Sequence, residues 1–212
     1  AYTGSVVVGQ AVARTCAETF KPCLIEASGN DPFIVMPSAP LDIAARGAAF
    51  AAYLNCGQVC TSAERFYVHD AIHDEFVERL TIEAKKLRVG NGLGQVDMGP
   101  MATRRQRERF EGMIAKARQQ GATVKTGGGR PASLNQGWYV EPTVLSDLTA
   151  DREILNEEPF GPVAPICRVK SFDSYQKALM SIAALAGAVA VILSLARGSW
   201  IALVAAIPLM LA

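Results

Sequence analysis

Cys60 is the residue of this 212-residue chain whose surroundings best suit covalent chemistry. It follows residues 41–54, whose apolar side chains recur at helical spacing, and Gly57, a residue type favoured where a helix ends. A β-type run at residues 65–68 comes next. A thiol on a turn between two rigid elements can meet a substrate, and cysteine needs little help to become a strong nucleophile. The alternative is a small buried cysteine without a chemical role.

Glu26 is a second candidate because it interrupts an apolar run, residues 23–26, that predicts a short buried strand. A partly buried carboxylate has a raised pKa, which brings it closer to the optimum for accepting a proton from water at neutral pH. A general base is therefore one interpretation of Glu26, although it is the less common role for a glutamate taken alone. The alternative is a strand-end carboxylate that is solvated or paired in a salt bridge.

Gly4 and Ser5 stand at the start of a predicted helix over residues 6–18. Ser5 is a suitable N-cap, and Val8, Val12 and Ala13 would form an apolar stripe. The N-terminus of a helix can bind an anion such as a pyrophosphate, because its backbone N–H groups are unpaired and its dipole is positive there. Many ordinary helices begin in the same way.

Four motifs together resemble one family. The run Asn55-x-Gly57-Gln58-x-Cys60, followed by Arg65, resembles the active-site signature of the NAD(P)-dependent aldehyde dehydrogenases. Three further stretches resemble the same family, in its order and at close to its spacing, and they are residues 2–9, 24–32 and 157–163. The resemblance extends from residue 1 to about residue 179.

The resemblance implies an α/β aldehyde dehydrogenase-like fragment, and helices that alternate with short apolar strands agree with that class. Residues 1–35 would be the end of a dinucleotide-binding domain and residues 36–177 most of a catalytic thiol domain. Residues 178–212 would be an apolar helical tail. On this interpretation the chain starts inside the family's sequence, and the family's first strands and its C-terminal part are absent.

The reaction implied by the resemblance is oxidation of an aldehyde to a carboxylic acid with NAD(P)⁺. Cys60 would add to the carbonyl carbon to give a thiohemiacetal and then a thioester, with its own backbone N–H as one oxyanion donor. Glu26 would activate the water that hydrolyses the thioester. The family's Glu-x-Gly-Gly motif reads Glu-Ala-Ser-Gly here, so Ser28 replaces the first glycine.

The cofactor would be NAD or NADP, and the strands that distinguish the two would lie upstream. By resemblance, Gly4 and Ser5 lie against the dinucleotide, Glu158 holds the hydroxyl groups of the nicotinamide ribose, and Phe160 packs near the nicotinamide ring. A carboxylate can accept two such hydroxyl hydrogen bonds. An aldehyde would be the substrate, and members of the intact family form homo-oligomers.

Composition argues against several other partners. The net charge of +1 provides no field for nucleic acid, and we expect the basic run at residues 104–107 to be a solvated helix face. The five cysteines have no disulfide-framework spacing, which suits a reducing cytosol. The pairs Cys56/Cys60 and His69/His73 lack further ligands, so we expect no metal site. Further helices are predicted at residues 71–87 and 101–120, and further strands at residues 32–36, 138–144 and 163–169.

The C-terminal residues differ in composition from the rest of the chain. Residues 178–196 carry no charged side chain and lie between Lys177 and Arg197. A membrane-spanning helix needs about 20 apolar residues, so the run is a candidate transmembrane helix. A frameshift in the gene and a buried core helix are the alternatives. The expected localisation is a cytoplasmic catalytic part with a membrane-associated tail.

Two alternatives compete with a dehydrogenase. The chain could be a membrane-attached, non-enzymatic remnant, or a cofactor-independent thiol esterase that uses Cys60 and Glu26. We also expect this chain by itself to be inactive, because half of a nucleotide-binding domain would leave sheet edges and apolar surface uncovered.

Overall fold

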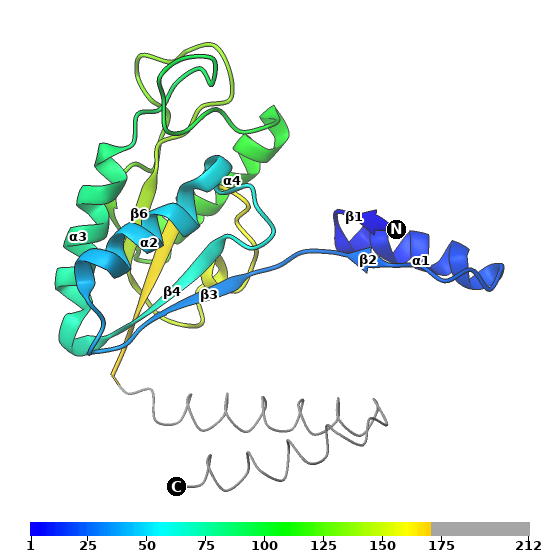
Figure 1. Ribbon diagram of the computed structural model, residues 1–212, viewed down its shortest axis with the longest axis horizontal. Helices are drawn as coiled ribbons and strands as arrows, with labels where there is room; N and C mark the ends of the chain where they lie inside the picture. Colours follow the sequence, from blue (N-terminus) through cyan, green and yellow to red (C-terminus); the bar gives the residue numbers. More distant parts are fainter. Residues whose placement is uncertain (171–212) are drawn as a thin grey trace, which may run out of the picture. The chain divides into compact units, whose positions relative to one another are not determined.

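A five-stranded sheet is the main element of the computed structural model, which describes residues 1–170 (Figure 1). Its strand order is β3-β4-β7-β6-β5, with β3 and β5 at the edges. The pairs β3–β4, β4–β7 and β7–β6 are parallel, and β5 is antiparallel to β6. The strands are β3 (Asp31–Val35), β4 (Ala63–His69), β5 (Thr123–Thr126), β6 (Thr143–Leu148) and β7 (Val163–Val169). The predicted α/β class is confirmed.

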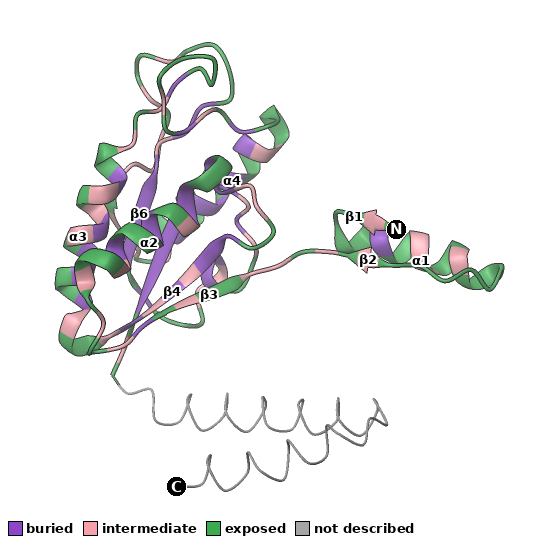
Figure 2. Cartoon of the chain, in the orientation of Figure 1, coloured by how far each residue is buried: buried purple, intermediate pink, exposed green. Residues whose placement is uncertain are grey.

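The first 26 residues form a smaller group of elements. Strands β1 (Tyr2–Thr3) and β2 (Ile25–Glu26) pair in parallel, and helix α1 (Val6–Glu18) connects them. The predicted cap of α1 is confirmed, because the Val8 N–H donates to the Ser5 hydroxyl oxygen at 3.5 Å. The apolar stripe of this helix is not covered within residues 1–170, since Val8 is exposed, Val12 and Ala13 are half-buried, and Gly9 is the only buried residue of α1. Figure 2 shows α1 as mostly exposed.

Helices α2 (Leu41–Tyr53) and α3 (His73–Lys86) pack against each other and against strands of the five-stranded sheet. Helix α4 (Arg104–Gln119) packs against the short η3 (Glu153–Leu155). Two further short 3₁₀ segments are η1 (Leu54–Gly57) and η2 (Asp70–Ile72). Both predicted helices, at residues 71–87 and 101–120, are therefore present, but each begins later in the chain than predicted.

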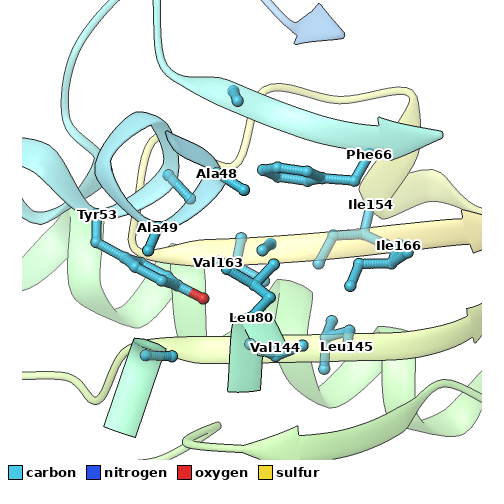
Figure 3. Close-up of a cluster of buried hydrophobic side chains, with 14 of the residues drawn as sticks. Ala48, Ala49, Tyr53, Phe66, Leu80, Val144, Leu145, Ile154, Val163 and Ile166 are labelled. Atoms are coloured by element: carbon cyan, nitrogen blue, oxygen red, sulfur yellow. The ribbon is translucent and has the colours of Figure 1, made fainter. Parts of the chain in front are cut away.

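Small side chains on α2 let the helix lie close to the sheet. Its buried face is alanine apart from Tyr53, whose hydroxyl donates to the Thr143 carbonyl oxygen at 3.1 Å. Phe66 of β4 and Leu80 of α3 are fully buried in the same core. Figure 3 shows part of this cluster, namely Ala48, Ala49, Tyr53, Phe66, Leu80, Val144, Leu145, Ile154, Val163 and Ile166.

The strand predicted at residues 138–144 is displaced toward the C-terminus. Residues 138–142 are irregular, and β6 begins at Thr143. Pro142 has no N–H for a ladder, and the Trp138 carbonyl oxygen accepts from Met101 N–H at 3.0 Å instead. The Trp138 ring lies 5.1 Å from the Arg107 guanidinium. The expectation of a fully solvated basic face is therefore wrong at Arg107, which is 8 % exposed.

Two predictions about chain organisation remain predictions. The proposed boundary at residue 35 follows β3, a strand that pairs with β4, and residues 1–170 form one unit. The predicted apolar span at residues 178–196 lies outside the described residues. Among residues 1–170, every helix is too short or too polar to cross a membrane.

The turn after α2 differs from the expected helix end. The helix stops at Tyr53, and the next residues include three in succession with left-handed backbone, Asn55, Cys56 and Gly57, at φ 51°, 59° and 67°. The Asn55 side-chain amide donates to the Gln58 carbonyl oxygen at 3.1 Å and holds this turn. A Cβ atom on Gly57 would lie 2.3 Å from the Gly161 carbonyl oxygen. Only glycine fits at position 57, because the close approach excludes a Cβ atom and the left-handed φ angle further disfavours one.

Two glycine substitutions test this turn. Gly57→Ala should lower the free energy of unfolding by at least about 2 kcal/mol, because it adds a left-handed alanine and a steric overlap. Gly47→Ala is the matched control, since a Cβ on this exposed α2 residue meets nothing within 4 Å. It should raise stability by about 0.5–1 kcal/mol. Urea unfolding of the full chain measures both, and equal effects would contradict the proposed constraint at Gly57.

Candidate active site

One cavity of about 430 Å³ brings together all six residues singled out from the sequence. Its volume is in the range typical of small-molecule sites. The six residues come from the start of α1, the end of β2, the turn before β4 and the turn before β7. The residues that line the cavity are Thr3, Gly4, Ser5, Glu26, Ala27, Ser28, Cys60, Arg105, Gln106, Arg109, Glu158, Pro159 and Phe160.

Cys60 lies in the tight turn that leads into β4, where the Ser62 N–H donates to the Val59 carbonyl oxygen at 3.0 Å. Its side chain is exposed. Gln58 fixes the approach to this turn: its amide oxygen accepts from Ala102 N–H at 2.9 Å, and its amide nitrogen donates to Gln106 Oε1 at 3.0 Å. The thiol is therefore accessible on a backbone that is fixed on both sides.

The two cysteines of the motif have different environments. Cys56 is only 2 % exposed, and burial raises the pKa of its thiol to about 12. A thiol of that pKa stays protonated and unreactive at neutral pH. Cys60, four residues later, is exposed at the cavity. Geometry thus distinguishes an inert thiol from an accessible one.

Glu26 lies in the same cavity, but its predicted partial burial is wrong. The residue is exposed, because β2 is only two residues long and pairs with β1 alone. Gly29, in the stretch that leads from Glu26 into β3, runs past Cys60, where a Cβ atom would lie 2.8 Å from the Cys60 carbonyl oxygen. Gly29, the one glycine of the Glu-Ala-Ser-Gly run, is therefore the position at which the two segments meet.

Another part of the cavity wall is lined by positively charged groups and by the N-terminus of a helix. Gly4 and Ser5 line it at the start of α1, a helix without an acidic residue in its first turn. Arg105 and Arg109 of α4 line it as well. A helix N-terminus and two guanidinium groups are complementary to an anion such as a phosphate. Sequence reasoning identified neither arginine: the run at residues 104–107, which includes Arg105, was taken for a solvated face, and Arg109 was not singled out.

The turn that carries Glu158 and Phe160 is held from two directions. A Glu158 carboxylate oxygen accepts from Gly29 N–H at 3.2 Å. Arg109 donates to the carbonyl oxygens of Glu158 and Pro159, at 2.9 and 3.2 Å. These contacts join the turn to the segment before β3 and to α4.

Glu64, the second residue of β4, is a buried carboxyl group beside the same turn. It is 3 % exposed, and its Oε1 accepts from Phe160 N–H at 2.9 Å. The pKa of Glu64 is raised to about 8: burial raises it most, and the negative charges of Glu158 and Asp31 also raise it, whereas the Phe160 N–H and Arg109 lower it. Since this pKa exceeds the value of about 4.3 for an unfolded glutamate, folding stability falls as pH rises between the two values. A glutamate directly before the β-type run at residues 65–68 was the available sequence signal.

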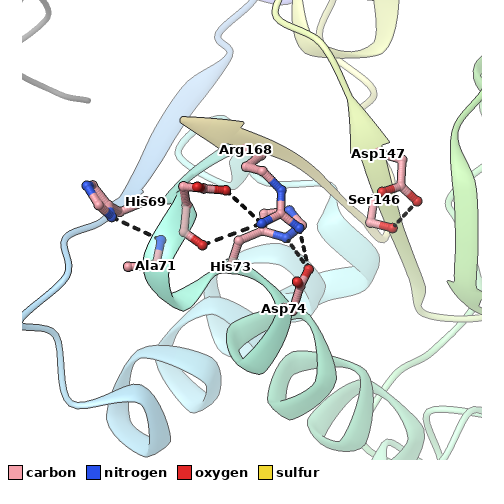
Figure 4. Close-up of polar contacts among 8 residues, drawn as sticks. His69, Ala71, His73, Asp74, Ser146, Asp147 and Arg168 are labelled. Atoms are coloured by element: carbon pink, nitrogen blue, oxygen red, sulfur yellow. Dashed lines mark hydrogen bonds and ion pairs between the residues drawn. The ribbon is translucent and has the colours of Figure 1, made fainter. Parts of the chain in front are cut away.

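A second cavity, of about 460 Å³, lies along α3 and β6 and contains none of the predicted site residues. Figure 4 shows its polar groups His73, Asp74, Ser146 and Asp147. The His73 ring contacts Asp74 at 2.9 Å, and Asp74 also pairs with Arg168. The cavity lining includes no cysteine, so the chemistry of a thiol belongs to the first cavity.

Thiol alkylation tests the difference between the two cysteines. At pH 8, iodoacetamide should label Cys60 at least about 100-fold faster than Cys56, because only a small fraction of a thiol with a pKa near 12 is ionised. Peptide mapping separates these sites from the other cysteines. Cys56→Ala should leave the Cys60 rate within about twofold, and urea should remove the difference in the wild-type chain. Equal labelling rates in the folded chain would rule out the distinction.

Curated relatives of the chain are aldehyde dehydrogenases. The chain is 42 % identical to 3-sulfolactaldehyde dehydrogenase of Pseudomonas putida over 173 residues, which is 81 % of this chain and 35 % of the relative. It is 41 % identical to the NADP⁺ succinate-semialdehyde dehydrogenase of Mycobacterium leprae over 172 residues, 81 % of this chain and 37 % of the relative. The chain thus spans little more than a third of the length of these relatives.

Solved structures give the same result. The structure of 3,6-anhydro-L-galactose dehydrogenase matches with a TM-score of 0.78 at 39 % identity, over 82 % of this chain and 37 % of that one. The NAD⁺ complex of aldehyde dehydrogenase from Bacillus cereus matches with a TM-score of 0.78 at 35 % identity, over 82 % and 35 % of the two chains.

The family model "Aldehyde dehydrogenase family" matches residues 1–190, which is most of the chain. This match continues past residue 179, where the resemblance of the motifs ends. It includes the accessible cysteine, the acidic residues and the helix N-terminus that share the first cavity. The chain belongs to the aldehyde dehydrogenase family.

Proposed function

We propose that the chain carries the thiol half of an NAD(P)⁺-dependent aldehyde dehydrogenase, in which an aldehyde, water and NAD(P)⁺ give a carboxylic acid, NAD(P)H and a proton. The observation that carries this proposal is the shared cavity. Cys60, Glu26, Glu158 and Phe160 come from distant parts of the sequence, yet all line one space with the N-terminus of α1.

Cys60 is the proposed nucleophile. Its sulfur forms a bond to the carbonyl carbon of the aldehyde, and the carbonyl oxygen becomes the oxyanion of a thiohemiacetal. The Cys60 backbone N–H makes no hydrogen bond within residues 1–170 and can donate to that oxyanion. Loss of a hydride from the same carbon then leaves a thioester on Cys60.

Glu26 is the proposed base for hydrolysis of the thioester. Its carboxylate lines the cavity and is exposed, so a water molecule can reach both this group and the acylated thiol. Glu26 accepts a proton from the water as the oxygen attacks the thioester carbon, and the C–S bond then breaks to release the acid and the Cys60 thiolate. This role requires that water can reach the Glu26 carboxylate, and it does not require the carboxylate to be buried.

The cavity residues fit a dinucleotide. Gly4 and Ser5 offer a helix N-terminus, and Arg105 and Arg109 offer two cations, which together suit a pyrophosphate. Glu158 is the proposed acceptor of ribose hydroxyl groups, and the Phe160 ring the proposed contact of the nicotinamide. Bound NAD(P)⁺ would supply the hydride acceptor.

We expect the 212-residue chain alone to show little dehydrogenase activity. Helix α1 leaves most of its apolar side chains uncovered, with Val7 77 % exposed, and nearby Phe20 is 97 % exposed. A cofactor platform with this much uncovered apolar surface and only two paired strands lacks the support that a rigid site needs. Homo-oligomers, as proposed from the family, would also depend on the intact enzyme.

A cofactor-independent thiol esterase is the second candidate, favoured by an exposed Cys60 that needs no cofactor to react. The membrane-attached remnant gains no support within residues 1–170, and the family match through residue 190 includes the first part of the predicted span. An association of residues 178–196 with membranes stays a prediction, which fractionation of the expressed chain tests.

Acyl transfer tests the roles of Cys60 and Glu26 in the chain itself. An activated ester such as p-nitrophenyl acetate should acylate Cys60, and mass spectrometry of peptides should locate the acyl group there. Cys60→Ala should lose this acylation. Glu26→Gln should still acylate but should lose the acyl group at least about tenfold more slowly, because it cannot accept the proton of water. Glu18→Gln, a change in an exposed acid outside the cavity, is the matched control.

The outcomes separate the candidates. NADH formation from an aldehyde, lost in Cys60→Ala, supports the dehydrogenase, whereas rapid ester turnover without any NADH formation supports the esterase. Deacylation of Glu26→Gln at the wild-type rate would exclude Glu26 as the base. An unacylated Cys60 in the folded chain would exclude the nucleophile.

A further inference from the structure

Glu64 occupies a position between the nucleophile and the proposed cofactor turn. It lies four residues after Cys60, at the point where β4 begins, and its side chain is buried rather than directed to solvent. The one hydrogen bond of this side chain among residues 1–170 joins Glu64 Oε1 to the Phe160 N–H, 96 residues away, at 2.9 Å. A buried carboxyl group with a single long-range partner calls for a physical reason.

Phe160 adopts a backbone conformation that needs such a partner. Its φ angle is 46°, in the left-handed region that bulky residues avoid. Such a conformation persists only where the surrounding structure holds it in place. Arg109 restrains the carbonyl oxygens of Glu158 and Pro159, but Glu64 is the group that binds the Phe160 N–H itself.

We propose that Glu64 is a positioning residue that holds the Glu158–Phe160 turn against β4 and so fixes both side chains relative to Cys60. The role of this turn in binding cofactor rests on the proposed function. The restraint of the turn by Glu64 does not depend on that function. Loss of the Glu64 acceptor should release the turn while the thiol stays accessible. The Gly29 N–H, which donates to the Glu158 carboxylate, should be released with it.

The charges around Glu64 make this tether sensitive to pH. Glu158 in the turn and Asp31 at the start of β3 are negative, and Arg109 of α4 is the positive group that faces it. At neutral pH the carboxyl group is mostly protonated and accepts through its carbonyl oxygen. Ionisation near pH 8 adds a negative charge beside two others, so the surroundings of Phe160 should change there.

Two substitutions in the full chain separate the tether from simple packing. Glu64→Gln keeps the acceptor but cannot ionise, whereas Glu64→Met keeps the length and loses the acceptor. At pH 7, NMR-detected hydrogen exchange of the Phe160 and Gly29 amides should be at least about tenfold faster in Glu64→Met than in wild type, and within twofold in Glu64→Gln. The Phe160 amide resonance should titrate near pH 8 in wild type and stay constant in Glu64→Gln.

Two controls make the result decisive. The Ala122 amide, which donates to the Ala117 carbonyl oxygen at 2.9 Å elsewhere in the structure, should exchange at the wild-type rate. Alkylation of Cys60 should stay within twofold in both variants. Equal acceleration of all three amides, or unchanged exchange at Phe160 in Glu64→Met, would overturn the proposal. None of these measurements needs cofactor or turnover, so failure of an activated ester to acylate Cys60 would count against the proposed function alone.

Discussion

The close approach of Gly57 to the peptide that joins Gly161 and Pro162 is the constraint on which the site depends. No side chain fits there, since a Cβ atom on Gly57 would lie 2.3 Å from a carbonyl oxygen. The contact holds the turn before Cys60 against the turn that follows Phe160. Because β4 and β7 are parallel neighbours, both turns come at the amino ends of their strands and are brought together by the pairing of the sheet. Backbone packing thus determines the spacing of the proposed catalytic and cofactor groups.

The cavity combines opposite ends of two groups of strands. Ligands of parallel sheets usually bind beyond the carboxyl ends of the strands, and the short β1–β2 pair follows this rule with Thr3 and Glu26. The five-stranded sheet instead contributes residues that precede β4 and β7, Cys60 and Phe160 among them. The β1–α1–β2 elements would therefore bind an anion at the start of α1, and the five-stranded sheet would place the thiol beside a carbonyl group.

Sequence patterns predicted local features well and long-range contacts poorly. The Ser5 cap, the α2 helix and the apolar β7 strand follow from capping and periodicity, which act over a few residues. The burial of Glu26 was wrong because the apolar residues before it are not covered in the structure. Arg109 and Glu64 were missed because their partners lie 50 or more residues away in the turn at Pro159 and Phe160. Such contacts have no periodic signature.

Two glutamates illustrate how surroundings divide roles between identical side chains. Glu26, at the end of a two-residue strand, is open to the water that a base must activate. Glu64 is enclosed, and burial raises its pKa to about 8, so at neutral pH it is mostly a neutral hydrogen-bonding group. A site that contains both can keep one carboxylate available for proton transfer while the other adds little charge beside Glu158. Ionisation of Glu64 would place a further negative charge beside those of Glu158 and Asp31, which would make the geometry of the proposed cofactor side of the cavity depend on pH.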